Sequence, residues 1–300
     1  MRAGPTEREK GANMPGHEGL LLVGHGSQSA ASGREMHAIA TLVADQLPEV
    51  RVDVGFLEMT EPSAGVVLDR LVDQGCHRIV VLPLVLLGAG HAKNDVAAVV
   101  LEGRQRHPRC DIDFGSPLGL AKDLVDIMGD AVTSVAGQGL PLLLVARGTS
   151  DPDANGDAAK AARLVGEWSA APFVHTGFTG VTGPSVPDAL EVFARLGFER
   201  VALGFWFLCT GKLIDRARAD IAAFTDRTGI TVLDAGYFGA DPRLLPIILE
   251  RYGQARAGAP VVNCDACSYR APWPGHEDRV GQPIGVGHSH LAEEHRHAHR

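Results

Sequence analysis

The sequence predicts an α/β protein with two tandem flavodoxin-like domains, each a parallel sheet flanked by helices, and an irregular C-terminal tail. Three observations predict this fold class. The chain has 300 residues, of which 45% are hydrophobic, which is enough for two ordinary cores. It contains an internal repeat, as expected for a duplicated folding unit. Each copy alternates short apolar runs with segments of helical periodicity.

The internal repeat has an offset of 122 residues. Residues 21–27 (LLVGHGS) reappear as residues 143–149 (LLVARGT). At the same offset Phe56, Thr60, Pro62, Gly75 and Arg78 match Phe178, Thr182, Pro184, Gly197 and Arg200. The copies differ at three polar positions, where the first has His25, Glu58 and His91 and the second has Arg147, Gly180 and, after a one-residue gap, Lys212.

The pattern of apolar residues predicts each element of the first copy. Continuous apolar runs indicate buried strands, and apolar residues three or four apart indicate helices. The expected strands are residues 19–23, 50–57, 78–85 and 111–114, and the expected helices are about 30–47, 61–74, 91–107 and 120–136. The second copy repeats this order from Pro141 to about Tyr252. This alternation favours parallel sheets, which bind ligands beyond the carboxyl ends of their strands.

The composition divides the chain into four segments. These are a polar, disordered lead-in (1–18), an N-terminal domain (19–137), a C-terminal domain (138–253) and a tail rich in Cys and His (254–300), with residues 136–139 as the linker between the domains. The lead-in lacks the apolar core of a secretory signal, and no apolar run reaches the roughly 18–20 residues of a membrane span. We therefore expect a cytoplasmic protein that binds no membrane.

The charge and the cysteines exclude two further classes of protein. The net charge is −8, which argues against nucleic-acid binding because that function needs a basic face. A local cluster of cations can still bind an anionic small molecule. Five cysteines, an odd number in a chain of this length, do not indicate a disulfide framework.

Three candidate site residues each follow a predicted strand of the first copy. His25, Glu58 and His91 come after the first, second and third strands, so they project from the same edge of one sheet. If the first and third strands are neighbours, His25 and His91 flank the crevice at the switch point. Two imidazoles and a carboxylate suit a first-row divalent metal, and they suit acid–base chemistry equally well.

Several motifs resemble the sirohydrochlorin chelatases, the CbiX-type class II chelatases of cobalamin and siroheme synthesis. They are residues 24–27 (GHGS), residues 56–58 (FLE) with Pro62, and residues 82–86 (LPLVL) leading to Gly90 and His91. The resemblance covers about residues 19–252. It implies two domains that face each other across a cleft holding the tetrapyrrole. It also implies that His25 and His91 bind the metal and that Glu58 assists.

The substrate that this resemblance implies gives the cations of the second copy a role. Sirohydrochlorin carries eight carboxylates, and Arg147 and Lys212 stand where the first copy has histidines. We expect these two residues, with Lys93 and Arg216, to bind the substrate carboxylates, because arginine can hold a carboxylate in a bidentate fork. The alternative is that these cations form ordinary ion pairs with nearby aspartates.

The tail contains a Cys-x-x-Cys motif, Cys264 and Cys267. Long members of the chelatase family carry a similar motif that is associated with an iron–sulfur centre. Two thiolates do not complete a four-cysteine cluster, so a homodimer joined through the tail, or other groups, would supply the remaining ligands. Zinc and a redox dithiol are the alternatives.

The tail also contains a histidine-rich end. Its histidines are His288, His290, His295, His297 and His299. We interpret them as an accessory site that gathers cobalt or nickel. The alternative is a solvated end with incidental metal affinity.

The leading functional hypothesis is a chelatase that inserts a divalent metal into sirohydrochlorin, with Co2+ favoured by the long form and its His-rich tail. Iron insertion for siroheme is the nearest alternative, and Ni2+ is a third metal that the ligand set allows. A non-enzymatic cobalt or nickel metallochaperone is the second alternative. A non-haem iron enzyme with two histidines and one carboxylate ranks lower.

Overall fold

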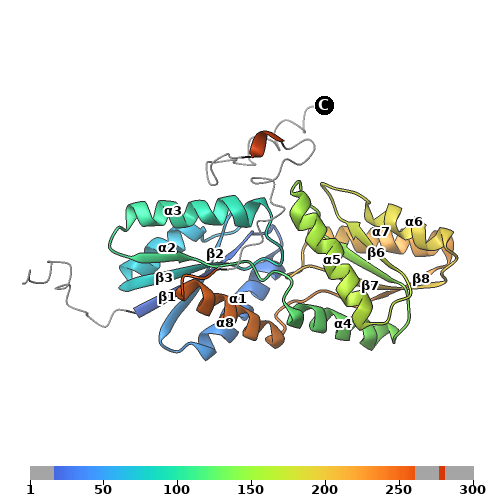
Figure 1. Cartoon of the computed structure of the whole chain (residues 1–300), viewed down its shortest axis with the longest axis horizontal. Helices are drawn as coiled ribbons and strands as arrows, with labels where there is room; N and C mark the ends of the chain where they lie inside the picture. Colours follow the sequence, from blue (N-terminus) through green and yellow to red (C-terminus); the bar gives the residue numbers. More distant parts are fainter. Residues whose placement is uncertain (1–16, 261–276, 281–300) are drawn as a thin grey trace, which may run out of the picture.

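The computed structural model describes residues 17–260 and 277–280, and its strands form two parallel sheets (Figure 1). In these residues the first sheet has the order β2-β1-β3-β4 and the second has the order β6-β5-β7-β8. The strands are β1 (His17–Gly24), β2 (Val50–Phe56), β3 (Cys76–Pro83), β4 (Asp111–Phe114), β5 (Leu142–Ala146), β6 (Val174–Phe178), β7 (Arg200–Phe205) and β8 (Thr231–Asp234). The first and third strands are neighbours in both sheets, which confirms the flavodoxin-like order.

Helices cover both faces of each sheet. They are α1 (Ala30–Gln46), α2 (Ala64–Asp73), α3 (Val96–Arg106), α4 (Lys122–Ala136), α5 (Pro152–Trp168), α6 (Val186–Arg195), α7 (Lys212–Thr228) and α8 (Leu245–Arg256), with a π-helical turn η2 (His91–Asp95) and short 3-10 turns η3 (Pro242–Leu244) and η4 (Glu277–Arg279). The described helices include none long and apolar enough to cross a membrane.

The central strands are apolar throughout because both of their faces are buried. Side chains alternate between the faces of a strand. In β1, Leu20 and Leu22 belong to the same apolar cluster as α1, whereas Leu21 and Val23 belong to the cluster formed with α2 and α3. All four side chains are fully buried. The continuous apolar run predicted in the sequence therefore corresponds to a strand covered on both sides.

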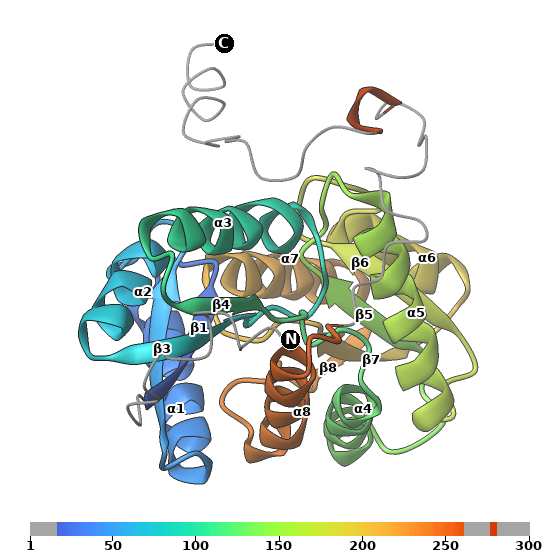
Figure 2. The ribbon, with the colours of Figure 1, turned by 60° about the vertical axis from the view of Figure 1, so that its left-hand side comes forward.

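The last helix of each copy packs on the sheet of the other copy. Helix α4, from the first copy, lies against α5 and β7, and helix α8, from the second copy, lies against α1 and β3 (Figures 1 and 2). A Cβ atom at Gly129 of α4 would stand 2.1 Å from Trp168, so the missing side chain permits this close approach. Helix α8 is held by Tyr252, whose hydroxyl donates to Glu18 at 2.8 Å.

Because of this exchange, the boundaries of the two sequence copies differ from the boundaries of the two packed halves of the structure. The two copies of the repeat are residues 19–137 and 138–253. We call each sheet with the helices packed on it a lobe: the first lobe contains β1–β4 and α8, and the second contains β5–β8 and α4. Each lobe is therefore completed by a helix from the other copy. The chain passes between the lobes in residues 115–121 and 235–244, and not in the predicted linker at 136–139, which joins α4 to β5. One apolar cluster consequently runs through both lobes, from Leu20 in β1 to Leu144 in β5.

Candidate active site between the two lobes

The predicted site residues lie at the carboxyl ends of strands in both lobes. His25, Glu58 and the turn that starts at His91 follow β1, β2 and β3, and Arg147 and Lys212 follow β5 and β7. Because β1 lies between β2 and β3, the first lobe presents its three positions at the switch point of its sheet. Contacts between the lobes, described below, place the corresponding edge of the second lobe against it.

The His25 imidazole and the Glu58 carboxylate face each other as a close pair. The distance from His25 Nε2 to Glu58 Oε1 is 3.1 Å, and the two side chains are 16% and 31% exposed. Backbone contacts fix the pair, because the Glu58 amide donates to the His25 carbonyl at 3.1 Å. Gly26 has a φ of +96°, and a Cβ atom there would stand 1.7 Å from the Glu58 carbonyl oxygen. Only glycine allows these two loops to touch.

The hydrogen bond on the other ring nitrogen of His25 determines what the pair can do. His25 Nδ1 lies 3.2 Å from the Gly26 carbonyl oxygen, which can only accept, so this nitrogen carries the hydrogen. In the neutral ring Nε2 then has a lone pair that points toward the Glu58 carboxylate. Two facing lone pairs repel, so the pair favours a proton or a cation at this place. The geometry suits both metal binding and proton transfer.

His91 begins the π-helical turn η2, directly before α3. The equivalent position of the second copy, Lys212, begins a regular α-helix. Single π-helical turns are frequent at functional sites. The side chain of His91 lies outside the described part of the structure. Among the described side chains no group of three metal-ligating residues is present, so the structure brings together two of the three predicted ligands, His25 and Glu58.

Arg147 lies across from this pair, in the second lobe. It is exposed to solvent, yet desolvation by the surrounding protein lowers its pKa, and the charge of Glu58 opposes that effect by raising the pKa. The Lys212–Gln28 hydrogen bond, described next, brings this edge of the second lobe against the first, in agreement with the effect of the Glu58 charge on Arg147. The predicted positions of the two copies therefore face each other here.

Lys212 and Arg216 lie on α7, at the same boundary. Lys212 is exposed, and its ammonium donates a hydrogen bond to the side-chain oxygen of Gln28 in the first lobe. A Cβ atom at Gly211 would stand 3.6 Å from the Ser27 hydroxyl. Arg216 is exposed one turn further along α7. Both cations remain open to solvent, as a substrate-binding role requires.

Lys93 differs from the sequence expectation. It is 8% exposed, and its Nζ lies 2.9 Å from Asp151 Oδ2 and 3.0 Å from Asp153 Oδ2, which are also buried. An ammonium held by two buried carboxylates is not available for a substrate carboxylate. Lys93 therefore ties the turn of His91 to the start of α5, and the expected aspartate pairing applies to this residue.

Glu35 is an inter-lobe residue that the sequence pattern does not reveal. It lies on α1, and its carboxylate accepts from the Thr210 amide at 2.8 Å and from the Tyr237 hydroxyl at 2.7 Å in the second lobe. Neighbouring Cys209 is half-buried, and desolvation together with Glu35 raises the pKa of its thiol to about 12. A charged helix position carries no sequence signal for such a contact, because the partner is distant in the sequence.

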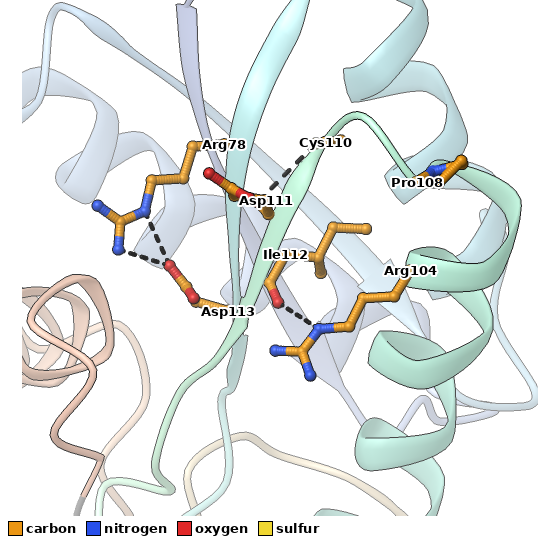
Figure 3. Close-up of a pocket in the computed structure, with 7 residues that line it drawn as sticks. All are labelled: Arg78, Arg104, Pro108, Cys110, Asp111, Ile112 and Asp113. Atoms are coloured by element: carbon orange, nitrogen blue, oxygen red, sulfur yellow. Dashed lines mark hydrogen bonds and ion pairs between the residues drawn. The ribbon is translucent and has the colours of Figure 1, made fainter. Parts of the chain in front are cut away.

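A separate cavity of about 510 Å³ lies at the opposite end of the first sheet (Figure 3). Its two arginines are engaged, because Arg78 pairs with Asp113 at 2.7 Å and Arg104 Nε donates to the Ile112 carbonyl at 2.8 Å. The cavity lies beside the start of β4, whereas the candidate site lies beyond the ends of β1 and β2. It is therefore not part of the site.

The predicted tail site lies outside the described residues. This applies to the Cys-x-x-Cys motif with its iron–sulfur, zinc, dithiol and homodimer interpretations, and to the histidine-rich end: Cys264, Cys267, His288, His290, His295, His297 and His299. The expected lead-in at 1–18 also lies almost entirely outside them.

Known proteins resemble this chain in both copies. Residues 19–135 and 141–255 match the CbiX family. The sirohydrochlorin cobaltochelatase of Priestia megaterium is 33% identical over 267 residues, which cover 86% of this chain and 87% of that protein. The sirohydrochlorin ferrochelatase of the same organism is 26% identical over 234 residues, which cover 77% and 88%.

A solved structure supports the same relationship. SirB from Bacillus subtilis with Fe3+ superposes with a TM-score of 0.71 at 26% identity, covering 81% of this chain and 96% of that chain. The superposition includes both lobes, since neither lobe alone accounts for that share of the chain. With matches to both copies of the repeat, the chain belongs to the CbiX family.

Proposed function

We propose that this protein is a sirohydrochlorin cobaltochelatase, which inserts Co2+ into sirohydrochlorin in cobalamin biosynthesis. The observation that carries the proposal is that the His25–Glu58 pair and the cations that follow β5 and β7 lie at one boundary between the lobes, where Lys212 donates to Gln28. A metal-binding and proton-accepting pair on one wall faces a cation on the other. This arrangement suits an anionic macrocycle whose centre must lose protons while it gains a metal.

The reaction exchanges two protons for one metal ion. Two pyrrole N–H groups lose their protons, and the four ring nitrogens then hold the metal. In our proposal His25 and His91 hold the incoming metal substrate loosely, through neutral imidazole nitrogens that can release it. Glu58, beside His25 Nε2, accepts protons from the ring nitrogens and passes them to solvent. Its 31% exposure provides that route.

The cations of the second lobe hold the substrate by its rim. Arg147, Lys212 and Arg216 bind carboxylates of the macrocycle and place its centre over His25 and Glu58. Arg147 is the most important of these, because it directly follows β5 at the position equivalent to His25. Lys212 and Arg216 are exposed to solvent, and we expect them to contribute less.

The choice of cobalt rests on resemblance. The relative named as a cobaltochelatase is 33% identical to this chain, compared with 26% for the relative named as a ferrochelatase. Imidazole and carboxylate ligands bind Co2+, Fe2+ and Ni2+ in an order set mainly by the metals themselves. Iron insertion for siroheme is therefore the alternative.

A spectroscopic assay tests the proposal. The protein is incubated anaerobically with sirohydrochlorin and Co2+, Fe2+ or Ni2+, and the change in the tetrapyrrole spectrum gives the rate for each metal. We expect the highest kcat/KM with Co2+, and a higher value with Fe2+ would assign the siroheme branch. No acceleration with any metal would overturn the chelatase assignment.

A second candidate function is a cobalt or nickel metallochaperone, in which the histidine-rich tail is the working part. It predicts that His25→Ala and His91→Ala leave metal transfer intact, whereas deletion of residues 288–300 abolishes it. Under the chelatase proposal the same deletion lowers the rate only at limiting metal. An iron–sulfur cluster at Cys264 and Cys267 would appear as visible absorbance in protein purified without oxygen, and Cys264→Ala would remove it.

A further inference from the structure

Met59 and Val181 occupy equivalent positions in the two copies and share an unusual conformation. Met59 directly follows Glu58, and Val181 follows Gly180, at the offset of 122 residues. Their φ angles are 57° and 66°. Positive φ is uncommon for any residue with a side chain, and for a β-branched residue such as valine it is a genuine outlier.

The same hydrogen bonds enforce this conformation in both loops. The Thr60 amide donates to the Glu58 carbonyl at 2.7 Å, and the Thr182 amide donates to the Gly180 carbonyl at 2.8 Å. Each bond spans two residues and closes a γ-turn whose central residue is Met59 or Val181. The loops are closed further by Phe56 and Phe178, whose amides donate to the carbonyls of Pro62 and Pro184.

The turns hold two apolar side chains in solvent. Met59 is 55% exposed and Val181 is 77% exposed. Burial does not explain either side chain, and a glycine would occupy the turn without strain. Two copies that differ at the preceding residue, Glu58 against Gly180, nevertheless share an exposed apolar residue in a strained turn. Strained backbone of this kind is concentrated at functional sites.

Both turns border the candidate site. Met59 adjoins Glu58, which pairs with His25. Val181 lies in the loop that supports Arg147, because the Thr179 hydroxyl donates to the Arg147 carbonyl at 3.1 Å. A Cβ atom at Gly148 would stand 2.2 Å from the Gly180 carbonyl, so these two loops are in contact. One apolar side chain therefore accompanies each wall of the site.

We propose that Met59 and Val181 bind the hydrocarbon surface of the tetrapyrrole, one from each lobe. This inference rests on the proposed function. A tetrapyrrole carries its charges on the rim and presents apolar faces and ring edges, so a site that recognises it needs both kinds of contact. The cations bind the carboxylates, and the two strained turns supply contacts to the ring. These contacts limit how far the macrocycle can slide across the His25–Glu58 pair.

Glycine substitutions separate ligand contact from a structural role. Met59→Gly and Val181→Gly remove the side chain and suit the turn, so neither should lower the Tm appreciably. We expect each to raise the Kd for metal-free sirohydrochlorin about fivefold, and the double variant to raise it at least tenfold. The conservative variants Met59→Leu and Val181→Met should retain the affinity. Leu101→Ala and Leu196→Ala are the controls, because these residues are 46% and 54% exposed away from the site.

Salt provides a second signature. The effect of Met59→Gly and Val181→Gly should persist at high ionic strength, because apolar contacts are not screened, whereas the effect of Arg147→Ala should shrink. An unchanged Kd in the double glycine variant, with wild-type protein that binds sirohydrochlorin, would overturn this inference and leave the proposed function standing. Wild-type protein that does not bind sirohydrochlorin would overturn the proposed function itself.

Discussion

The two lobes share one fold but present different chemistry at the same edge of the sheet. In the first lobe His25 and Glu58 follow the ends of β1 and β2, and they lie 3.1 Å apart. In the second lobe the equivalent positions are Arg147 and Gly180. Desolvation lowers the pKa of Arg147, and the charge of Glu58 opposes that effect. Under the proposed function, this difference means that the two copies of the repeat supply opposite walls of one site, with metal and proton chemistry on the first and substrate binding on the second.

The turn after the third strand shows the same divergence. In the first lobe it is π-helical and carries Lys93, which is buried between Asp151 and Asp153. In the second lobe a regular helix starts at Lys212, and the position equivalent to Lys93 is Ile214, which is fully buried in the apolar core. The first copy thus has an inter-lobe ion-paired cluster at a position where the second copy has an apolar residue packed inside its own lobe.

The largest expected effect on activity comes from substitutions in the His25–Glu58 pair. His25→Ala should lower kcat for metal insertion by about 10²–10⁴-fold, because it removes a metal ligand and a proton acceptor. The comparison predicts that Arg147→His does not rescue this variant, since the second wall lacks a counterpart of Glu58. Steady-state kinetics with sirohydrochlorin and Co2+ measure both. Activity within a few-fold of wild type in His25→Ala would contradict the division of roles.

Breaking the buried cluster should mainly reduce stability. Lys93→Met leaves two buried carboxylates without their ammonium, which costs about 3–5 kcal/mol in the free energy of unfolding. Urea denaturation measures the loss. Arg163→Met is the control, because Arg163 pairs with Glu167 at the exposed surface, where an ion pair contributes about 0–1 kcal/mol.

A triple variant sharpens this prediction. Lys93→Met combined with Asp151→Asn and Asp153→Asn removes all the buried charges, so it should be more stable than Lys93→Met alone. A triple variant that is less stable would show that the aspartates stabilise the start of α5 independently of Lys93. The Asp151 carboxylate could provide such stabilisation, because it also accepts a hydrogen bond from the Asp153 amide at the start of α5.

Substitutions of the cations in the second lobe should change the KM for sirohydrochlorin more than kcat. Arg147→Ala should raise the KM for sirohydrochlorin about tenfold with little change in kcat, since the loss of one charge-assisted contact is worth about 1.5–3 kcal/mol at most. Arg216→Ala should change the KM about twofold, because its exposed charge is screened. An effect on kcat as large as that of His25→Ala would contradict a purely binding role for Arg147.

The smallest expected effect is a change in how the Tm depends on pH when the contact that holds α8 is altered. Glu18 anchors α8 to the first sheet, and although desolvation raises its pKa, the hydrogen bonds from Tyr252 and Arg256 outweigh this and lower the pKa below its usual 4.5. A depressed pKa stabilises the fold above the unfolded-state value, and that stabilisation is lost as the pH falls through the folded-state value. Glu18→Gln should therefore flatten the loss of Tm on acidification below about pH 4.5.

The second lobe offers the control for this pH effect. Its exchanged helix, α4, approaches α5 through Gly129 and Trp168, and residue 140, the equivalent of Glu18, is leucine. Leu140→Gln should leave the acid dependence of the Tm unchanged. If Leu140→Gln and Glu18→Gln had the same effect, the ion pair at α8 would not be the cause.

Most of the local structure could be predicted from the sequence. The expected strand at 50–57 is β2 (Val50–Phe56), and the expected helix at 120–136 is α4 (Lys122–Ala136). The main local difference is the expected helix at 61–74, which begins at Ala64 because the closed loop around Met59 occupies the preceding residues. Strand ends also predicted the His25–Glu58 pair, since parallel strands meet at one edge.

The sequence by itself determined the repeat, the order of elements and the edge of the sheet that carries the candidate site, because hydrophobic period and turn residues act over a few positions. Only the tertiary structure decided that α4 and α8 exchange lobes, that Lys93 is buried between two aspartates, and that Met59 and Val181 are held outward. The helix exchange and the buried cluster depend on which distant segments meet, and Lys93 is 58 and 60 residues from its two aspartates. The turns at Met59 and Val181 depend on hydrogen bonds that close each loop, which hydrophobic periodicity does not reveal. The periodicity of an amphipathic helix shows that it has an apolar face, but it does not show which sheet that face packs against.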